Sequence, residues 1–560
     1  MKLKNIFAAI GLSAVMTSCG FLEVEPQVIC SDTFYNTQEE ALYGLAGVYG
    51  VMSNEPFYGN YYSLMCSNVD DLCYFNRSTT ANYTNMYKHD ASATEVYQAW
   101  IEIYKGIRNA NAFMEAIPST PFDKEGKLYN EARFLRAYYH FLLAQAWGDV
   151  PMRKQAVTTH DQIMCGVSPQ FEVLAWVAEE MEACVKLAGT DISNSPSRIN
   201  EYVVRGILAR VYLFMAGETV KCDNKSEYYR MAMEHAQTII SSNKFQLNPD
   251  YTKVFINMVS DEYDIEFNES MWEVDFIGHR ASAETWSNGR IGDLIGLQSS
   301  GSSDYSQFLC NFAYGQYDGS LKLWDLYWKT DRTEDEEALP TLTDKRHEWN
   351  MPPYNYAGRT STALGINIPA SIEKAPYIYN SEDSFTNPVT AQAVRNCGKW
   401  RREVEYEGVM DSKRLYTGIN FPLLRYSDVL LMYAEASLEY SNAVSQEAFN
   451  CVKAVRDRAG IKTKDIADYD TESFRQFVRN ERGRELCFEA IRKYDLIRWG
   501  IFVDAMKGYI KDASDDRWSK DAKATYAAEI GRAVQAKHVV LPVPSVELGV
   551  NTEIVQNPLW

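Results

Sequence analysis

Residues 131–152 read EARFLRAYYHFLLAQAWGDVPM and carry a strong helical pattern. Apolar and aromatic side chains recur at three- and four-residue intervals up to Trp147, as they do on the buried side of a helix. Gly148 and Pro151 follow, and these residue types commonly mark the end of a helix. The spacing predicts a helix over Tyr129–Trp147.

Similar patterns lie on both sides of this stretch. Small residues followed by large aromatic ones echo the tetratricopeptide design, a helix–turn–helix unit of about 34 residues. Units of this kind stack and bury their shared faces, so a stack of helix pairs is expected. The helices predicted before the middle of the chain are Thr37–Met52, Glu95–Ala116, Phe171–Leu187, Asn200–Met215 and Glu227–Ser241. The predicted pairs are 100–117 with 131–147, 200–215 with 227–241, and 423–440 with 445–459.

The middle of the chain, 261–418, has a different character. Short β-type runs such as Ser270–Ile277 lie among Gly, Ser, Asn and Pro, and Trp and Tyr are frequent. Loop regions of more than about 15 residues are uncommon inside a compact chain and usually carry function. Trp272, in an apolar run, and Trp324, in LKLWDLYW, are expected in the core.

The first residues resemble an export signal. Met1–Lys4 are basic, Ile6–Met16 are apolar, and small residues precede Cys19, a pattern typical of a secretory signal. The apolar run is too short for a permanent membrane helix, and no later segment has 18 consecutive apolar residues. We therefore expect a signal peptide over 1–18 and a mature chain that does not span a membrane.

Composition excludes several classes of function. The 560 residues include 56 Lys+Arg and 75 Asp+Glu, a formal net charge of -19, which argues against nucleic acid as a ligand. The 37 Tyr and 12 Trp suggest surfaces on which ligands stack. The eleven Cys form no CxxC pair and no Cys/His cluster at metal spacing, so a structural zinc is not expected. No cofactor and no metal ligand are assigned, and a metal ion in the middle loops stays an open question. Most of the ten Cys after Cys19 are expected to be buried.

Catalytic motifs are missing from the sequence. It contains no HExxH, GxSxG or P-loop. Asp70 and Asp71 lie in a polar, aromatic loop between two helices and are candidates for ligand binding, against the simpler alternative of a solvated acidic surface. The segment Glu481–Trp499 is expected to be one helix. Its glutamates at 481, 485 and 489 could form a lattice of ion pairs with arginines within or between helices.

Six strings, in order, resemble the SusD/RagB family of outer-membrane lipoproteins. They are WIEIYKGIRNANAFMEAIP (100–118), EARFLRAYYHFLLAQAWGDVPM (131–152), LLRYSDVLLMYAEASLEY (423–440), VKAVRDRAGI (452–461), ERGRELCFEAIRKYDLIRW (481–499) and VVLPVPSVEL with QNPLW in the tail (539–560). The resemblance implies a mainly α-helical SusD-like fold, with four tetratricopeptide-like helix pairs as scaffold and a loop-rich region with short β segments. Its implied division is 19–260 for an amino-terminal helical region and 261–560 for a carboxy-terminal region. The latter would hold ligand-binding loops over 261–418 and helices over 419–510.

The same resemblance implies a function. Family members capture nutrients, usually glycans, at the outer membrane, without catalysis. They deliver them to a SusC-like TonB-dependent transporter. The residues before Cys19 resemble a lipobox, which implies acylation of Cys19 and attachment to the membrane through several chains. Some members serve peptide uptake, so peptide capture on the same fold is the alternative, and a hydrolase is the third hypothesis.

The family also implies a site. In starch-binding members an arc of exposed aromatic residues holds the ligand, and one ring comes from the loop before the helix that contains Trp100. By position, Tyr87 and Asp90 correspond to that ring and its polar partner. Trp286, Tyr314 and Tyr317 are the predicted rings of the middle loops, against the alternative that these rings pack the loops onto the scaffold. A local basic patch from Arg77, Lys88 and Arg290 would admit acidic glycans.

Overall fold

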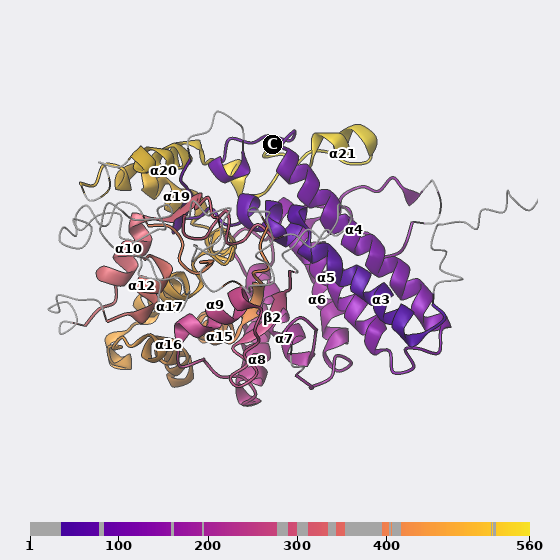
Figure 1. Cartoon of the computed structure of the whole chain (residues 1–560), viewed down its shortest axis with the longest axis horizontal. Coiled ribbons are helices and arrows are strands. Elements are labelled where there is room, and N and C mark those ends of the chain that lie inside the picture. Colours follow the sequence, from indigo (N-terminus) through magenta and orange to yellow (C-terminus); the bar gives the residue numbers. More distant parts are fainter. Residues whose placement is uncertain are drawn as a thin grey trace, which may run out of the picture.

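The computed structural model describes residues 35–77, 83–157, 159, 162–192, 195–276, 289–298, 312–333, 343–352, 395–402, 405, 416–516, 518 and 522–560. Within these ranges the protein is mainly α-helical, and its strands are short (Figure 1). The predicted fold class is confirmed.

A row of helices forms the amino-terminal half, and each helix of the row packs against the next. The row consists of α3 (Gln38–Tyr49), α4 (Thr94–Ala116), α5 (Lys127–Trp147), α6 (Gln170–Val185), α7 (Glu201–Met215) and α8 (Lys225–Ser241). Local chemistry defines the ends. Thr37 Oγ1 accepts a hydrogen bond from Glu40 N at 3.1 Å, and Glu40 Oε2 accepts one from Thr37 N at 3.0 Å, so a capping box starts α3. The helices predicted from periodicity are confirmed to within a few residues.

Helices of the carboxy-terminal half continue this row. Helix α15 (Tyr426–Ser441) packs against α8 and against α16 (Gln446–Ala459), so the predicted helix pairs form one stack. The remaining helices are α9 (Tyr251–Ser260), α10 (Leu321–Trp328), α12 (Lys345–Asn350), α17 (Thr471–Leu486), α18 (Arg492–Arg498), α19 (Phe502–Asp512), α20 (Ala522–Ala533) and α21 (Ser545–Val550). Short 3₁₀ helices lie at Gly50–Ser53, Thr84–Met86, Ile117–Ser119, Ile466–Asp468 and Ala536–Val539. Short π-helical segments lie at Glu55–Gly59 and Tyr61–Cys66.

Two small antiparallel sheets tie the middle of the chain to the helices. Strand β1 (Cys73–Phe75) pairs with β3 (Tyr317–Gly319), and β2 (Ser270–Val274) pairs with β4 (Phe421–Arg425). The predicted β run is thus confirmed, whereas the helix expected from residue 423 begins only at Tyr426, because Leu423 and Leu424 belong to β4. Trp272 and Trp324 are buried, as expected.

The segment predicted as one helix over 481–499 is broken. Helix α17 ends at Leu486, and α18 starts at Arg492. Between them Phe488 and Ala490 have φ angles of 67° and 57°, in the left-handed region that residues other than glycine rarely adopt. The expectation of a continuous helix is wrong because the alternating charges bond to other elements rather than along one helix.

Those charges form a buried ion-pair lattice, which confirms the interpretation drawn from the sequence. The Arg425 guanidinium donates to Glu269 Oε1 at 3.0 Å, to Glu485 Oε1 at 3.0 Å and to Glu489 Oε1 at 2.8 Å. Arg346 donates to Glu481 Oε1 at 2.6 Å. The residues of this ion-pair lattice are all buried, and they are Glu269, Asp344, Arg346, Lys399, Arg425, Arg456, Arg458, Glu481, Arg484, Glu485 and Glu489.

The described cysteines behave as small apolar side chains. Cys66, Cys73, Cys184, Cys397, Cys451 and Cys487 are buried free thiols, while Cys165 and Cys222 are half-buried. Burial raises the pKa of the Cys487 thiol to about 11, so it stays protonated at neutral pH. Among the described helices, none is long and apolar enough to cross a membrane.

We predict that Arg425→Ala destabilises the protein strongly. The substitution leaves the carboxylates of Glu269, Glu485 and Glu489 buried with one cation fewer, and breaking such a buried pair costs about 3–5 kcal/mol. Denaturation in urea measures the change. The matched control is Arg230→Ala, since Arg230 forms exposed ion pairs with Glu227 and Glu234 and its loss should leave the unfolding midpoint unchanged. Equal effects of the two substitutions would contradict the assigned role of the lattice.

Candidate functional site

Tyr87, the ring predicted from the loop before α4, lies inside the protein. Its side chain is 3% exposed, and its hydroxyl donates to Val69 O at 2.5 Å. The ring meets His538 edge-on, with 5.4 Å between centroids, and also contacts Phe502 at 5.8 Å. A left-handed backbone at Tyr87, with φ of 53°, turns the side chain inward after Thr84–Met86. The expectation of an exposed ring here is wrong, and in this loop Tyr83 is the exposed one, at 40%.

Asp90 is exposed but stabilises a turn. Its Oδ1 accepts hydrogen bonds from Ser92 N at 2.8 Å and from Ser92 Oγ at 2.6 Å, just before α4 begins. These bonds hold the pKa of Asp90 below its ordinary value. Because Tyr87 points away, the structure does not pair Asp90 with a ring.

Asp70 and Asp71 are buried, so the expectation of accessible carboxylates is wrong. Asp71 accepts from Arg492 Nε at 2.9 Å and from Lys322 Nζ at 2.5 Å. Burial alone would raise the pKa of Asp71, but these two cations hold it below its ordinary value. Burial and the neighbouring Asp71 raise the pKa of Asp70, whose Oδ1 accepts from Leu72 N at 2.7 Å. Both residues hold the loop in place.

The rings predicted in the middle loops differ in their exposure to solvent. Tyr317 lies in β3, is 1% exposed and meets Phe75 edge-on at 5.6 Å, so it packs the loop onto the scaffold, as the alternative predicts. Tyr314 is 36% exposed. Trp286 lies outside the described residues.

Tyr314 is the centre of a group of rings and arginines. Its ring meets Phe312 edge-on, with 4.7 Å between centroids, and its carbonyl accepts from Arg77 Nη2 at 2.7 Å. Its backbone N donates to Asp293 O at 2.6 Å. The backbone of Tyr314 is therefore held on both sides, while its ring packs against Phe312 and stays partly open to solvent.

Arg290 links Asp293 to further rings. Its guanidinium pairs with the Asp293 carboxylate at 2.9 Å and with Glu55 at 3.4 Å, and it lies 6.0 Å from the ring centroid of Tyr416. Tyr61 is half-buried and lies two residues after Gly59, whose carbonyl accepts a hydrogen bond from Arg290 N at 2.8 Å. Burial raises the pKa of Tyr61, and the carboxylate of Glu55 adds to the shift. We call this group the ring–arginine surface: Tyr61, Arg77, Arg290, Phe312, Tyr314 and Tyr416.

This surface contains two of the three cations considered for a basic patch. Arg77 and Arg290 flank the 293–314 contact, whereas Lys88 is elsewhere and pairs with Glu529 at 2.9 Å. Among the described residues, no group of three or more His, Cys, Asp or Glu side chains is suited to a metal ion.

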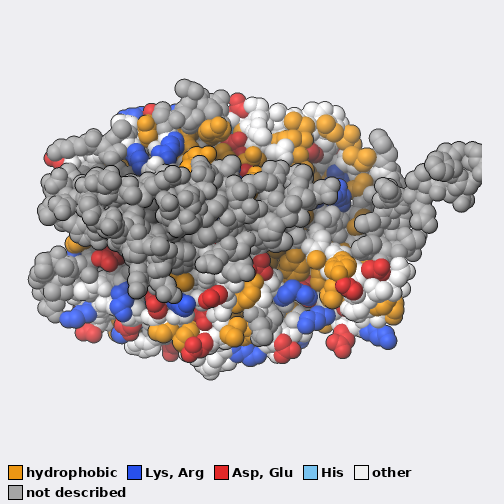
Figure 2. All heavy atoms as spheres, viewed as in Figure 1, with side chains coloured by type: hydrophobic (Ala, Val, Ile, Leu, Met, Phe, Trp, Pro, Cys, Tyr) orange, Lys and Arg blue, Asp and Glu red, His pale blue; other side chains and the backbone are white. Residues whose placement is uncertain are grey.

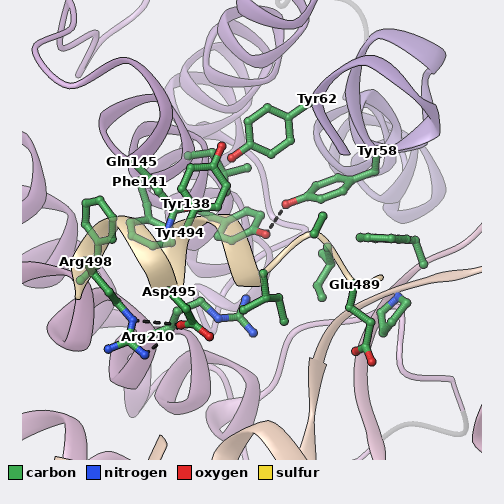
Figure 3. Close-up of a pocket in the computed structure, with 17 residues that line it drawn as sticks. Tyr58, Tyr62, Tyr138, Phe141, Gln145, Arg210, Glu489, Tyr494, Asp495 and Arg498 are labelled. Atoms are coloured by element: carbon green, nitrogen blue, oxygen red, sulfur yellow. Dashed lines mark hydrogen bonds and ion pairs between the residues drawn. The ribbon is translucent and has the colours of Figure 1, made fainter. Parts of the chain in front are cut away.

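A small hollow lies between α5, β4 and α18 (Figure 3). Tyr58 and Tyr138 share a hydrogen bond of 2.5 Å there, and Arg498 pairs with Asp495 at 2.8 Å. The cavity volume is about 60 Å³, enough for a few water molecules and too small for a sugar ring. We therefore interpret this hollow as a small gap in the packing where these elements meet, and not as a sugar-binding site.

Comparison with known proteins identifies the family. The model of the SusD family matches residues 268–560, and a second family model, described as "Starch-binding associating with outer membrane", matches residues 20–213. The chain belongs to the SusD family. Among curated relatives of this SusD-family chain, SusD-like protein P25 of Formosa agariphila is 24% identical, over 100% of this chain and 98% of the relative. SusD-like protein P38 of the same organism is 25% identical, over 92% and 95%.

Solved structures share the fold. A SusD homologue from Bacteroides thetaiotaomicron superposes with a TM-score of 0.78 at 24% identity, covering 95% of this chain and 98% of the homologue. A laminarin-binding SusD-like protein superposes with a TM-score of 0.65 at 20% identity, over 94% and 100%. Surface glycan-binding protein A from Bacteroides fluxus gives 0.67 at 19% identity, over 94% and 100%.

Sequence reasoning missed several members of the ring–arginine surface in this SusD-family protein. Tyr61 belongs to the tyrosine-rich segment before α4, and Tyr416 and Phe312 belong to the aromatic middle, so composition pointed to both regions. Which rings face outward depends on backbone turns that composition does not encode.

We predict that Tyr87→Ala lowers stability. Removing a buried aromatic side chain typically costs about 3–5 kcal/mol, and here the hydrogen bond to Val69 O is also lost. Thermal and urea unfolding measure this. Tyr314→Ala is the matched control because that ring is partly open to solvent, and its melting temperature should fall much less. A Tyr87→Ala protein with unchanged stability would contradict the buried position.

Proposed function

We propose that this protein captures glycans at the bacterial cell surface without cutting them. The description of the matched family model and the names of the laminarin-binding and surface glycan-binding neighbours support a glycan ligand. The observation that carries the proposal is the ring of Tyr314, open to solvent beside Phe312, Arg77 and Arg290.

Stacking would supply the binding energy. A sugar ring has an apolar C–H face, which a flat aromatic side chain covers. Burying roughly 100 Å² of apolar surface is worth about 2.5 kcal/mol before association costs are subtracted. Several rings are therefore required, and the ring–arginine surface offers Tyr61, Phe312, Tyr314 and Tyr416 within one neighbourhood.

Arginines would fix the hydroxyl groups of the sugar. Guanidinium N–H groups donate in a fixed geometry, and hydroxyl oxygens accept them. With a net charge of -19, the chain as a whole repels acidic polysaccharides, so neutral glycans are the favoured class.

The two carboxylates that pair with Arg290 next to this surface are poorly placed for hydrolysis. Asp293 and Glu55 both pair with Arg290. Burial raises the pKa of Asp293 to about 7, yet its side chain is fully buried and cannot touch a bound sugar. A glycosidase needs two carboxyl groups on either side of the scissile bond. The binding role is therefore preferred over the hydrolytic one.

The ligand loops and the anchor complete the proposal. We assign ligand binding to the 261–418 region, with Tyr61 and Arg77 contributed from 19–260. Acylated Cys19 would attach the protein to the outer membrane, and a SusC-like TonB-dependent transporter would receive the glycan. Family membership supports both assignments.

We predict that Tyr314→Ala weakens glycan binding about tenfold, because one stacked ring is lost. Titration calorimetry with a panel of neutral oligosaccharides, laminarin-derived glucans among them, measures the affinity. Tyr440→Ala is the matched control, since Tyr440 is similarly exposed, at 42%, on α15. Equal affinity in the two variants would reject the site, and binding of peptides with no response from any glycan would reject the ligand class.

We predict that Cys19→Ser moves the protein out of the membrane fraction, because acylation requires the thiol. Fractionation and labelling with a palmitate analogue measure the change. Cys165→Ser is the matched control, since Cys165 is a half-buried free thiol in the folded part of the chain. Retention of the label in Cys19→Ser would contradict the assigned anchor.

A further inference from the structure

A separate hollow lies between α3, residues 197–198 and the end of β2. Its volume is about 420 Å³, which suits a small organic molecule. Leu42, Tyr43, Ala46 and Met52 form one wall. It shares no residue with the ring–arginine surface.

Two carboxylates form the floor of this hollow. Glu273 and Asp275 are two residues apart at the end of β2, so their side chains point to the same face. The backbone N of Glu273 donates to Pro196 O at 3.0 Å, which fixes the floor against the 195–198 turn.

These carboxylates have oxygen atoms without hydrogen-bond donors. Glu273 is 3% exposed, and its Oε2 is buried and unpartnered, as is Asp275 Oδ1. In the part of the chain that the structure describes, neither residue forms an ion pair. The nearby Arg198 is already paired with Glu131, through Nε at 2.9 Å and Nη2 at 2.7 Å. A carboxyl group buried in this way ionises at low cost only when a cation pairs with it, so the site favours a positively charged ligand.

The directions in which the two pKa values are shifted agree with a site that favours a cation. Burial raises the pKa of Glu273 to about 8 and that of Asp275 to about 6. The charge of Asp261, at the end of α9, raises both pKa values further. The polar side chains of Ser270 and Asn420 lower the pKa of Glu273, and those of Ser197 and Tyr263 lower the pKa of Asp275. At neutral pH Glu273 therefore carries a proton that a cation would displace.

We propose that this hollow binds a primary ammonium group carried on a small, partly apolar molecule. Among the described residues no set of His, Cys, Asp and Glu is suited to a metal ion, whereas an ammonium group needs only a few acceptors. The exposed ring of Tyr43 offers an aromatic face to the cation, and Leu42 and Met52 cover the apolar part of the ligand. An amino sugar and a lysine side chain both supply this chemistry. The proposal does not depend on the glycan-binding role.

Titration calorimetry of the mature chain at pH 7 tests the proposal with matched pairs of ligands. Glucosamine is compared with N-acetylglucosamine, and N-acetyl-lysine amide with N-acetyl-norleucine amide, so that each pair differs chiefly in the ammonium group. We expect one or both amines to bind and their neutral partners not to bind. The binding heat should vary with the ionisation enthalpy of the buffer, because Glu273 releases its proton. Equal binding of a neutral partner, or no binding of either amine, overturns the proposal.

Substitution then locates the site. Glu273→Gln should weaken amine binding at least about tenfold and remove the buffer dependence, because the titrating carboxyl is lost. Glu266→Gln, on the exposed loop before β2, is the matched control and should change neither. Should Glu273→Gln lower the melting temperature, Asp275→Asn provides the second variant. Unchanged amine affinity in a folded variant of either residue overturns the assignment.

Discussion

The guanidinium of Arg425, sealed inside the protein, is the constraint on which the rest of the structure depends. It bonds at once to Glu269, just before β2, to Glu485 in the last turn of α17, and to Glu489 within the break between α17 and α18. It also lies 5.4 Å from the ring of Phe255 on α9. A buried charge is tolerated only when its partners are all in place, so a single arrangement of β2, β4, α9 and α17 satisfies it.

The break after α17 follows from the same constraint. Left-handed backbone at Phe488 and Ala490 costs of order 1–3 kcal/mol for each residue. In return, the Glu489 carboxylate reaches both Arg425 and Lys399, the latter at 2.6 Å. Trp400 Nε1 donates to Phe488 O at 3.1 Å and holds the distorted segment. The strain persists because the charges would otherwise remain unpaired.

The lattice also bears on ligand capture, through the chain that leads into β4. Thr417 and Gly289 form an antiparallel bridge directly beside Tyr416 and Arg290, and Ile419 is buried just before the strand. Two members of the ring–arginine surface are thus held within a few residues of the rigid core. Rings fixed before the ligand arrives lose little conformational entropy on binding, which favours affinity.

Local periodicity was enough to predict the helices from α3 to α8, and α16, because each of them buries a face whose spacing is visible in the sequence. It failed where a distant partner decides the backbone. Glutamates at 481, 485 and 489 have the spacing of one continuous helix, yet Arg425 and Lys399 draw the last of them away. The same limit applies to the rings: Tyr314 and Tyr317 lie three residues apart in one aromatic loop. Tyr317 enters β3 opposite Phe75 and is buried by that pairing, whereas Tyr314 precedes the strand and stays open to solvent. A register between segments more than 200 residues apart selects between them, and no local pattern contains that register.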